Sequence, residues 1–411
     1  MTKQTQTQTL TTQQTTLINQ TQTTGKPIKD AGSYSHALKT PNNQPHITTK
    51  PQRIIYPATP QINETTLINL ANSYANFIAE NCPLIETSQV DAKISWEEKQ
   101  ITITNGASLY SLMPETLLRI KLTSNNHTLE ESYGVAATPE DFLQDEWNYH
   151  CANILHLYNH LQNKAQGYPI TTTHKNATCV IAPRLSSKII AQTLGHHAKA
   201  DIMRDCFPRS PFIMLPRLSP KLSVIDFAHT SFDQPTDFPI IMDDEGTLAS
   251  NVALITGGQM DMPMTNCETA AQMGLPLTGN ARTHSYKQKP QIHTRNLALM
   301  PWDDMVSDIL ASVEDGYLLV DGDGFTWDYE GRFAFDLRVG YFIRDGRICE
   351  AITSAKVAGR MREFLQSISM IGSDFVWYFN GDIDKHEVRS TSGSPTIKAC
   401  LDIREGVAAL S

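Results

Sequence analysis

The sequence contains no long hydrophobic run, and this absence excludes one class of protein. Nowhere do its 411 residues approach the roughly 20 consecutive apolar residues that a helix needs to span a bilayer. The N-terminus also lacks the basic region and apolar core that mark a secretory signal. We therefore expect a cytoplasmic protein that makes no membrane contact.

Clustered basic residues and paired cysteines are also missing. The formal net charge is -9, and no basic stripe is present that would neutralise a run of phosphates, so we expect no nucleic-acid partner. The seven cysteines stand apart from one another, with no C-x-x-C pair. We expect them to be reduced, small buried side chains rather than metal ligands or nucleophiles.

The first part of the chain is rich in Thr, Gln and Asn instead. Residues 1–60 contain stretches such as TQTQTLTTQQTT, with few large apolar side chains to offset the entropy of ordering the backbone. We predict a disordered tail. A docking arm for a partner is the functional alternative, which composition alone does not favour.

Residues 61–175 are predicted to form a module of helix, meander and helix. Apolar side chains recur at helical spacing from Glu64, and alternating strands follow, with a hairpin turn at Asn105-Gly106. Thr138 is a candidate N-cap for a second helix running to about Gly167, because Pro139 and two acidic residues come after it.

Residues 176–411 are predicted to be a mixed, mostly antiparallel, sheet-rich domain, which makes the fold class α+β. A strand at 179–182 leads into a helix for which Ser186 is the expected cap. Two further helices are expected at 303–313 and 357–371, with a hairpin from Phe333 to Ala351 turned at Asp345-Gly346. The VDGDG segment at 320–324 is expected to be a loop between strands, because the Glu that a calcium loop requires is absent.

Six segments of the second half carry a resemblance through their order and spacing. They are APRLSSKIIAQTLGHHAKAD (182–201), IIMDDEGTLASNVALITGGQM (240–260), LTGNAR (277–282), HTRN (293–296), the long hairpin at 315–352, and GSPTIKACLDI (393–403). In this order they resemble the TldD/TldE (PmbA) family of bacterial peptidase proteins. The resemblance implies a central α/β module and a C-terminal domain of TldD/PmbA type. The family's usual additional N-terminal domain has no evident counterpart, so we expect a shortened relative.

The resemblance also locates a zinc site that this chain has largely lost. TldD-type members carry His-Glu-x-x-x-His on a helix and a Cys near the C-terminus. Three protein ligands leave a position for a water whose pKa the metal lowers, and the Glu accepts its proton. Here Ala191 stands at the first His position and Gln192 at the Glu position, while His196 is retained. The Cys position falls near Asn380.

One retained ligand of three predicts no catalytic residue and no bound metal in this chain. The helix around Ala191 to Asp201 keeps Gly195, which would ease the widened turn that two histidines five apart require. A rearranged site around His196 is the alternative, although no spacing in the sequence favours it. Its other members would come from His229, His284, His293 and His386. The adjacent His197 points about 100° away from His196 around the helix, so the two cannot easily chelate one ion.

Three further residues are candidates for substrate binding. The resemblance suggests that Arg282 and Asn280, from TGNAR, contact a peptide, with Arg282 holding a carboxylate through two hydrogen bonds. Asp244, from the DDEG turn, would form a polar wall of the cleft. The structural alternatives are a surface ion pair for the arginine and an ordinary turn for the acidic residues, and we prefer the latter for DDEG.

The missing ligands indicate a non-catalytic, TldE-like subunit. The resemblance implies that such a chain pairs with a TldD-like, zinc-bearing subunit with an intact His-Glu-x-x-x-His, and that the complex acts on small or unfolded peptides. Zinc is then a cofactor of the partner rather than of this chain. Two alternatives stay open, a divergent zinc metallopeptidase with a rebuilt site and a peptide-binding scaffold without a protease partner.

Overall fold

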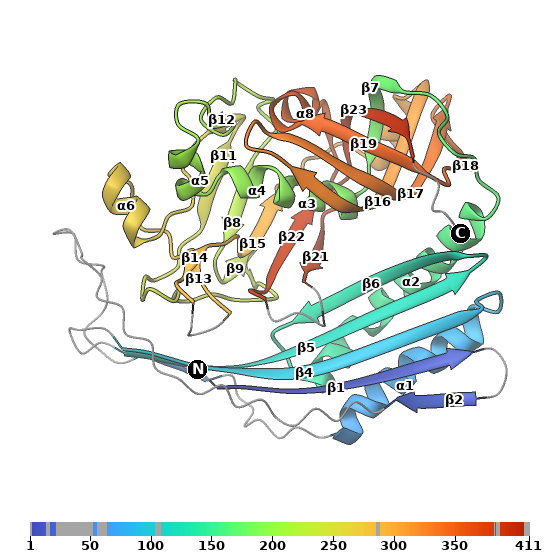
Figure 1. Ribbon diagram of the computed structural model, residues 1–411, viewed down its shortest axis with the longest axis horizontal. Coiled ribbons are helices and arrows are strands. Elements are labelled where there is room, and N and C mark those ends of the chain that lie inside the picture. Colours follow the sequence, from blue (N-terminus) through green and yellow to red (C-terminus); the bar gives the residue numbers. More distant parts are fainter. Residues whose placement is uncertain are drawn as a thin grey trace.

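The computed structural model describes residues 2–13, 17–21, 52–55, 64–102, 108–284, 288–381, 383 and 387–406. It contains two sheet-based modules, which lie one above the other in Figure 1. This arrangement confirms the predicted α+β class. None of the described helices is long and apolar enough to cross a membrane.

The N-terminal module is a six-stranded sheet with two helices against it. The apolar face of the first helix, including Leu67, Leu70 and Tyr74, is buried as its spacing predicts. The second helix begins as predicted, because the Thr138 hydroxyl accepts a hydrogen bond from the Asp141 N–H at 3.3 Å. The helices and main strands are α1 (Glu64–Asn81), α2 (Pro139–Lys164), β4 (Thr87–Thr102), β5 (Ser108–Ser124) and β6 (His127–Val135).

Three strands of this sheet lie in the segment predicted to be a disordered tail. They are β1 (Thr2–Gln13), β2 (Leu17–Thr21) and β3 (Gln52–Ile55). β1 pairs with β4 along its whole length, so the structure gives these residues extended, paired backbone where the sequence predicts a disordered tail. The physical reason is that β-branched threonine favours extended backbone, and the edge of β4 supplies the hydrogen-bond partners. The predicted Asn105-Gly106 turn lies outside the described residues.

The C-terminal module combines a closed barrel-like sheet with a second, open sheet. The barrel runs β16, β7, β23, β19 and β17, and pairing between β16 and β17 closes it. The predicted hairpin turned at Asp345-Gly346 is present between two of its strands. The barrel strands are β7 (His174–Ile181), β16 (Asp315–Trp327), β17 (Arg332–Arg344), β19 (Ala355–Arg360) and β23 (Ile397–Glu405), with β18 (Arg347–Ala351) and β20 (Met370–Ile371) attached.

The open sheet is mostly antiparallel and carries the second half of the predicted site. Its order is β12, β11, β8, β15, β22 and β21, and only its β15–β22 pair is parallel. Its strands are β8 (Val224–Phe227), β11 (Val252–Thr256), β12 (Gln259–Met260), β15 (Asn296–Leu299), β21 (Val376–Asn380) and β22 (Ser390–Ser394). Two small ladders flank it, β9 (Thr230–Ser231) with β10 (Gln234–Pro235), and β13 (Ala281–Arg282) with β14 (Gln291–Ile292).

Helix α3 (Pro183–Gln192) packs between these two sheets. It contacts β16 of the barrel on one side and β22, β15 and β21 of the open sheet on the other. Its predicted start at Ser186 is wrong, because Pro183 occupies the first helical position and presets the backbone there. The Ser186 hydroxyl lies 2.6 Å from the Ser394 hydroxyl instead, joining α3 to β22.

Two other boundaries differ from the sequence predictions. The segment predicted as a helix from 357 begins as strand β19, because Val357 pairs with Phe335 and Ile403 on both sides and completes the barrel. The helix α8 (Met361–Ser367) follows, and the other predicted helix is the short α7 (Val306–Ala311). VDGDG is part of β16 rather than a loop. Gly322 there lies against Phe335, which a Cβ would approach to 2.6 Å.

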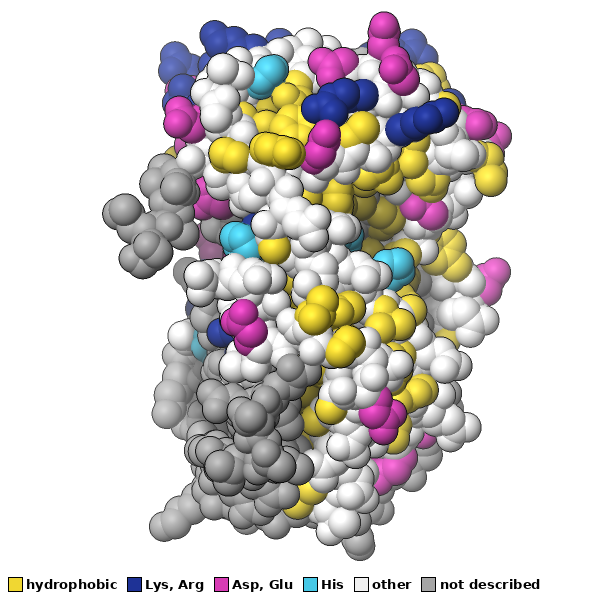
Figure 2. Space-filling view, turned by 90° about the vertical axis from the view of Figure 1, so that its right-hand side faces the viewer, with side chains coloured by type: hydrophobic (Ala, Val, Ile, Leu, Met, Phe, Trp, Pro, Cys, Tyr) yellow, Lys and Arg dark blue, Asp and Glu magenta, His cyan; other side chains and the backbone are white. Residues whose placement is uncertain are grey.

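The surface carries charges of both signs. On the face shown in Figure 2, Lys and Arg side chains of the upper, C-terminal module lie beside Asp and Glu side chains. This mixture is what the sequence, with its scattered acidic and basic residues, predicts.

Candidate functional site

The predicted metal-binding helix is interrupted in the structure. Instead of one helix from Ala191 to Asp201, α3 ends at Gln192, and α4 (Leu194–His197) and α5 (Ala200–Asp205) follow. The break falls at Thr193, whose hydroxyl donates to the Ile189 carbonyl at 2.6 Å. Such a bond from a β-branched residue to the preceding turn bends a helix. The local geometry therefore differs from a regular helix just before the retained histidine.

The two degenerate positions lie at the end of α3. The Ala191 methyl is partly buried and packs against the core of the C-terminal module. Gln192 is exposed. Neither side chain offers a carboxylate or an imidazole, so α3 supplies no proton acceptor and no metal ligand at these positions.

His196 lies on α4, half-buried beneath an aromatic ring. Its imidazole stacks on Trp327, with ring centroids 3.6 Å apart and an interplanar angle of 32°. Its Nε2 is buried without a hydrogen-bond partner among the described residues. Burial, reinforced by the nearby charges of Lys199 and His197, lowers the pKa of His196 to about 4. The ring is thus held neutral, with one face covered by the indole.

His197 is the adjacent histidine, and it is buried more deeply, at 1% exposure. Its ring centroid lies 5.3 Å from that of His196, nearly perpendicular to it, and 6.5 Å from that of Trp327. Burial lowers its pKa, while Asp328 opposes that effect. The packing around the pair is aromatic rather than polar.

Asn380 is at the end of β21, on the side of the open sheet that faces α3. Its backbone pairs with Ser390, and its side-chain oxygen accepts a hydrogen bond from the Ser392 hydroxyl at 3.0 Å. Two neighbours identify the side: Ser394 bonds Ser186 of α3, and Tyr378 lies under the Arg184 guanidinium of α3. The strand that carries Asn380 therefore packs against the predicted helix, as the resemblance requires of a third ligand position.

The residues present do not fit the zinc that such a site implies. A catalytic zinc needs three His, Cys, Asp or Glu ligands converging on one point. Within the described ranges, no group of three such side chains is arranged to hold a metal ion. His229, His284 and His293 belong to this described part of the chain, whereas His386 lies outside it.

The three predicted substrate residues come close together around the DDEG turn. Asp244 accepts a hydrogen bond from the Thr283 N–H at 2.7 Å, and an Arg282 guanidinium nitrogen donates to the Arg389 carbonyl at 2.7 Å. Asn280 is fully buried, and its amide donates to Asp226 at 2.8 Å and to the His293 carbonyl at 2.9 Å. In these positions the three side chains join β13 to its neighbours, and contact with substrate stays a prediction.

Asp243, next to Asp244, anchors the same turn. Its two oxygens accept hydrogen bonds from the N–H groups of Glu245, Thr247 and Ala281 at 2.9–3.0 Å. Burial, together with the charges of Glu245 and Asp244, raises its pKa to about 7, against the effect of these bonds. The DDEG segment therefore clamps β13 to the turn, which supports the structural explanation preferred from the sequence.

Two charged clusters were not foreseen from the sequence. Asp226 and Arg295 form an ion pair at 2.8 Å with both side chains fully buried. Asp321 lies among three cations, Lys188, Arg184 and Arg338, which lower its pKa strongly against the effect of burial. Arg184 also pairs with Glu131 of β6, linking the two modules. A charge inside an apolar segment, such as Asp226 in VIDFA (224–228), was the available signal.

Fold and site together define an α+β protein in which an interrupted helix packs between a closed barrel-like sheet and an open sheet. The family model for the PmbA/TldA metallopeptidase C-terminal domain matches residues 174–400, more than half of the chain. The chain belongs to the TldD/TldE (PmbA) family.

Curated relatives resemble part of the chain. A zinc metalloprotease TldD homolog of Saccharolobus solfataricus is 28% identical over 241 residues, covering 57% of this chain and 51% of that protein. A metalloprotease TldD homolog of Buchnera aphidicola subsp. Acyrthosiphon pisum is 24% identical over 318 residues, covering 73% and 63%. The chain thus spans about half to two thirds of the length of these relatives.

Solved structures match its fold more completely. TldE from Thermococcus kodakarensis superposes with a TM-score of 0.62 at 13% identity, covering 98% of this chain and 95% of that one. A Thermotoga maritima protein described as a candidate modulator of a DNA gyrase gives a TM-score of 0.66 at 14% identity, covering 98% and 94%. At this identity the likeness establishes the fold.

Proposed function

We propose that this chain is a non-catalytic, TldE-like subunit of a TldD/TldE-type peptidase complex that processes small or unfolded peptides. The observation that carries the proposal is the state of the α3–α4 segment. Ala191 and Gln192 offer neither ligand nor base, and the His196 imidazole is stacked on Trp327. A partner with an intact His-Glu-x-x-x-His would supply the zinc and the base.

The packing of this segment supports a structural rather than a catalytic role. α3 packs between the barrel and the open sheet. Its Arg184 and Lys188 side chains form ion pairs with Asp321 of the barrel. Arg184 also reaches Glu131 of the other module. The helix that carries the metal in a TldD-type chain here contributes to holding the two modules together.

The test is a reconstitution with a zinc-bearing relative. The chain is co-expressed with a TldD-type protein that has the complete motif, and the complex is isolated by size-exclusion chromatography. Hydrolysis of a labelled unstructured peptide is then measured for the chain, the partner and the mixture. We expect a stable heteromeric complex whose activity exceeds that of the partner alone and depends on the partner's Glu.

The zinc content of the chain tests the main alternative, a rebuilt metallopeptidase site. Elemental analysis of the purified chain, with His196→Ala as the comparison, is expected to give the same substoichiometric zinc for both proteins. Stoichiometric zinc that disappears in His196→Ala, together with hydrolysis by the chain alone, would establish the enzyme and refute the subunit proposal. A chain that neither binds metal nor forms a complex would fit the scaffold alternative.

A further inference from the structure

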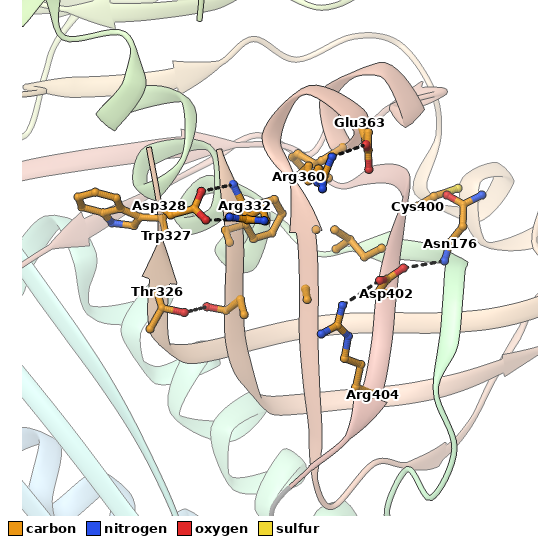
Figure 3. Close-up of a pocket in the computed structure, with 16 residues that line it drawn as sticks. Asn176, Thr326, Trp327, Asp328, Arg332, Arg360, Glu363, Cys400, Asp402 and Arg404 are labelled. Carbon is orange, nitrogen blue, oxygen red and sulfur yellow. Dashed lines mark hydrogen bonds and ion pairs between the residues drawn. The ribbon is translucent and has the colours of Figure 1, made fainter. Parts of the chain in front are cut away.

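A cavity of about 550 Å³ lies on the outer face of the barrel, away from the predicted substrate residues around the DDEG turn. Figure 3 shows it spread over β16, β17, β19 and β23, with charged side chains along its borders. Its size is within the range of small-molecule sites, about 300–1,000 Å³. None of the roles assigned above uses it.

The centre of the cavity has a floor of small side chains. Ala334 of β17 pairs with Ala358 of β19, and the same row continues to Thr326 on one side and Asp402 on the other. Larger side chains at the two alanines would fill the space. The short row between Thr326 and Asp402 therefore leaves room for a ligand of a few residues.

Two arginines stand side by side at one border of this floor. Arg332 and Arg360 are direct cross-strand partners, and their side chains are 54% and 56% exposed. Like charges directly opposite each other on a sheet are destabilising. A carboxylate placed between two guanidinium groups removes that repulsion and accepts their donors in bidentate geometry.

The acidic partners of these arginines leave donors available. Arg360 contacts Glu363 at 3.7 Å and makes no hydrogen bond with the other described residues. Arg332 donates to Asp328 at 2.7 Å and also pairs with Glu330 at 3.0 Å. Such exposed ion pairs contribute little to stability. A ligand carboxylate can therefore compete for both guanidinium groups at little cost.

The opposite border of the cavity contains the carboxylate of Asp402. Asp402 of β23 accepts a hydrogen bond from the Asn176 N–H at 3.0 Å and pairs with Arg404 at 3.1 Å. These donors fix the carboxylate in place and lower its pKa, although burial opposes them. The cavity thus has Asp402, paired with Arg404, across the alanine floor from two arginines that are paired with Asp328, Glu330 and Glu363.

We propose that this cavity binds a short peptide with free termini, its C-terminal carboxylate between Arg332 and Arg360 and its N-terminal ammonium toward Asp402. The carboxylate of a zwitterion would exchange with the acidic partners of the two arginines, its ammonium would exchange with Arg404 beside Asp402, and the alanine floor accommodates small side chains. The inference does not depend on the subunit role proposed above, since it concerns binding to this chain alone. Trp327 borders the cavity while stacking on His196, which connects the site to α4.

Calorimetric titration of the full chain with trialanine tests the proposal. Trialanine with both termini free is compared with its C-terminal amide, its N-acetyl form and inorganic phosphate. We expect saturable binding of the free peptide, at least about tenfold weaker binding of either blocked form, and no comparable binding of phosphate. Tight binding of phosphate alone, or of the amide as well as the free acid, would overturn the assignment.

Three variants locate the binding on the chain. Arg332→Gln and Arg360→Gln should each weaken trialanine binding by at least about tenfold. Arg344→Gln is the matched control. Arg344 is on β17, as Arg332 is, and its side chain is 55% exposed. It pairs with Glu350 at 2.7 Å outside the cavity. Circular dichroism verifies that each variant is folded. Equal losses in all three variants, or no loss in the first two, would refute the site.

Discussion

The His196 imidazole and the Trp327 indole stack at 3.6 Å between ring centroids. This contact joins α4 to the end of β16, two segments far apart in the sequence. It gives His196, the residue predicted from the sequence to be the retained ligand position, an aromatic partner. The indole also excludes water from the ring, which contributes to the low pKa of His196.

Replacement of Trp327 should release His196. In Trp327→Ala we expect the pKa of His196 to rise from about 4 toward its ordinary value, because the ring becomes solvated. The free energy of unfolding should fall by about 2 kcal/mol through loss of the stacked ring. NMR titration and urea denaturation measure the two effects. Trp302→Ala, at a tryptophan that is 45% exposed, is the control and should leave the titration of His196 unchanged.

Restoration of the family ligands should create zinc affinity. The triple variant Ala191→His, Gln192→Glu and Asn380→Cys places two new ligands and a base around His196, with β21 already packed against α3. We expect zinc to bind at least about tenfold more tightly than to the natural chain. Competition with a chromophoric chelator measures it. No gain, even when Trp327→Ala is added, would mean that Asn380 is not the counterpart of the Cys.

The buried pair of Asp226 and Arg295 should be essential for stability. Asp226→Asn leaves an uncompensated guanidinium in the core, and we expect a loss of about 3–5 kcal/mol in the free energy of unfolding. The exposed pair of Arg344 and Glu350 is the comparison, since Glu350→Gln should lower the free energy of unfolding far less than Asp226→Asn. Denaturant titrations of both variants measure the difference. Equal effects would contradict the assigned importance of burial.

Acidification should destabilise the protein through its buried histidines. Burial lowers the pKa of His150 to about 3, and its Nδ1 lies 2.7 Å from the Tyr74 hydroxyl. Because the unfolded pKa is about 6.5, the native state favours the neutral ring. The contribution of neutral His150 to the free energy of unfolding is complete above pH 6.5 and decreases as the pH falls toward 3. At pH 4 the free energy of unfolding should be lower by on the order of 3 kcal/mol.

The acid limb of the stability curve tests that effect. The free energy of unfolding is measured by denaturant titration at several pH values between 7 and 4. His150→Phe should flatten the decrease, whatever its effect at neutral pH. His156→Gln changes an exposed histidine of the same helix and should leave the decrease unaltered. An unaltered decrease in His150→Phe would assign the acid sensitivity to other groups.

Local patterns predicted part of the fold. The spacing of Leu67, Leu70 and Tyr74 and the cap at Thr138 identified both helices of the N-terminal module. The segment around Val357 was misassigned, because its strand state depends on pairing with partners on both sides. Helical spacing and a barrel strand cannot be distinguished there without those partners.

The sequence by itself determined which chemical groups the degenerate site contains. Ala191, Gln192 and Asn380 cannot provide the ligands and base of a catalytic zinc, whatever the fold. Only the tertiary structure decided what those groups contact: Trp327 covers His196, and Ser392 occupies the Asn380 oxygen. The reason is that the residue type fixes the chemical groups of each side chain, whereas burial and stacking arise between segments that only the folded chain brings together.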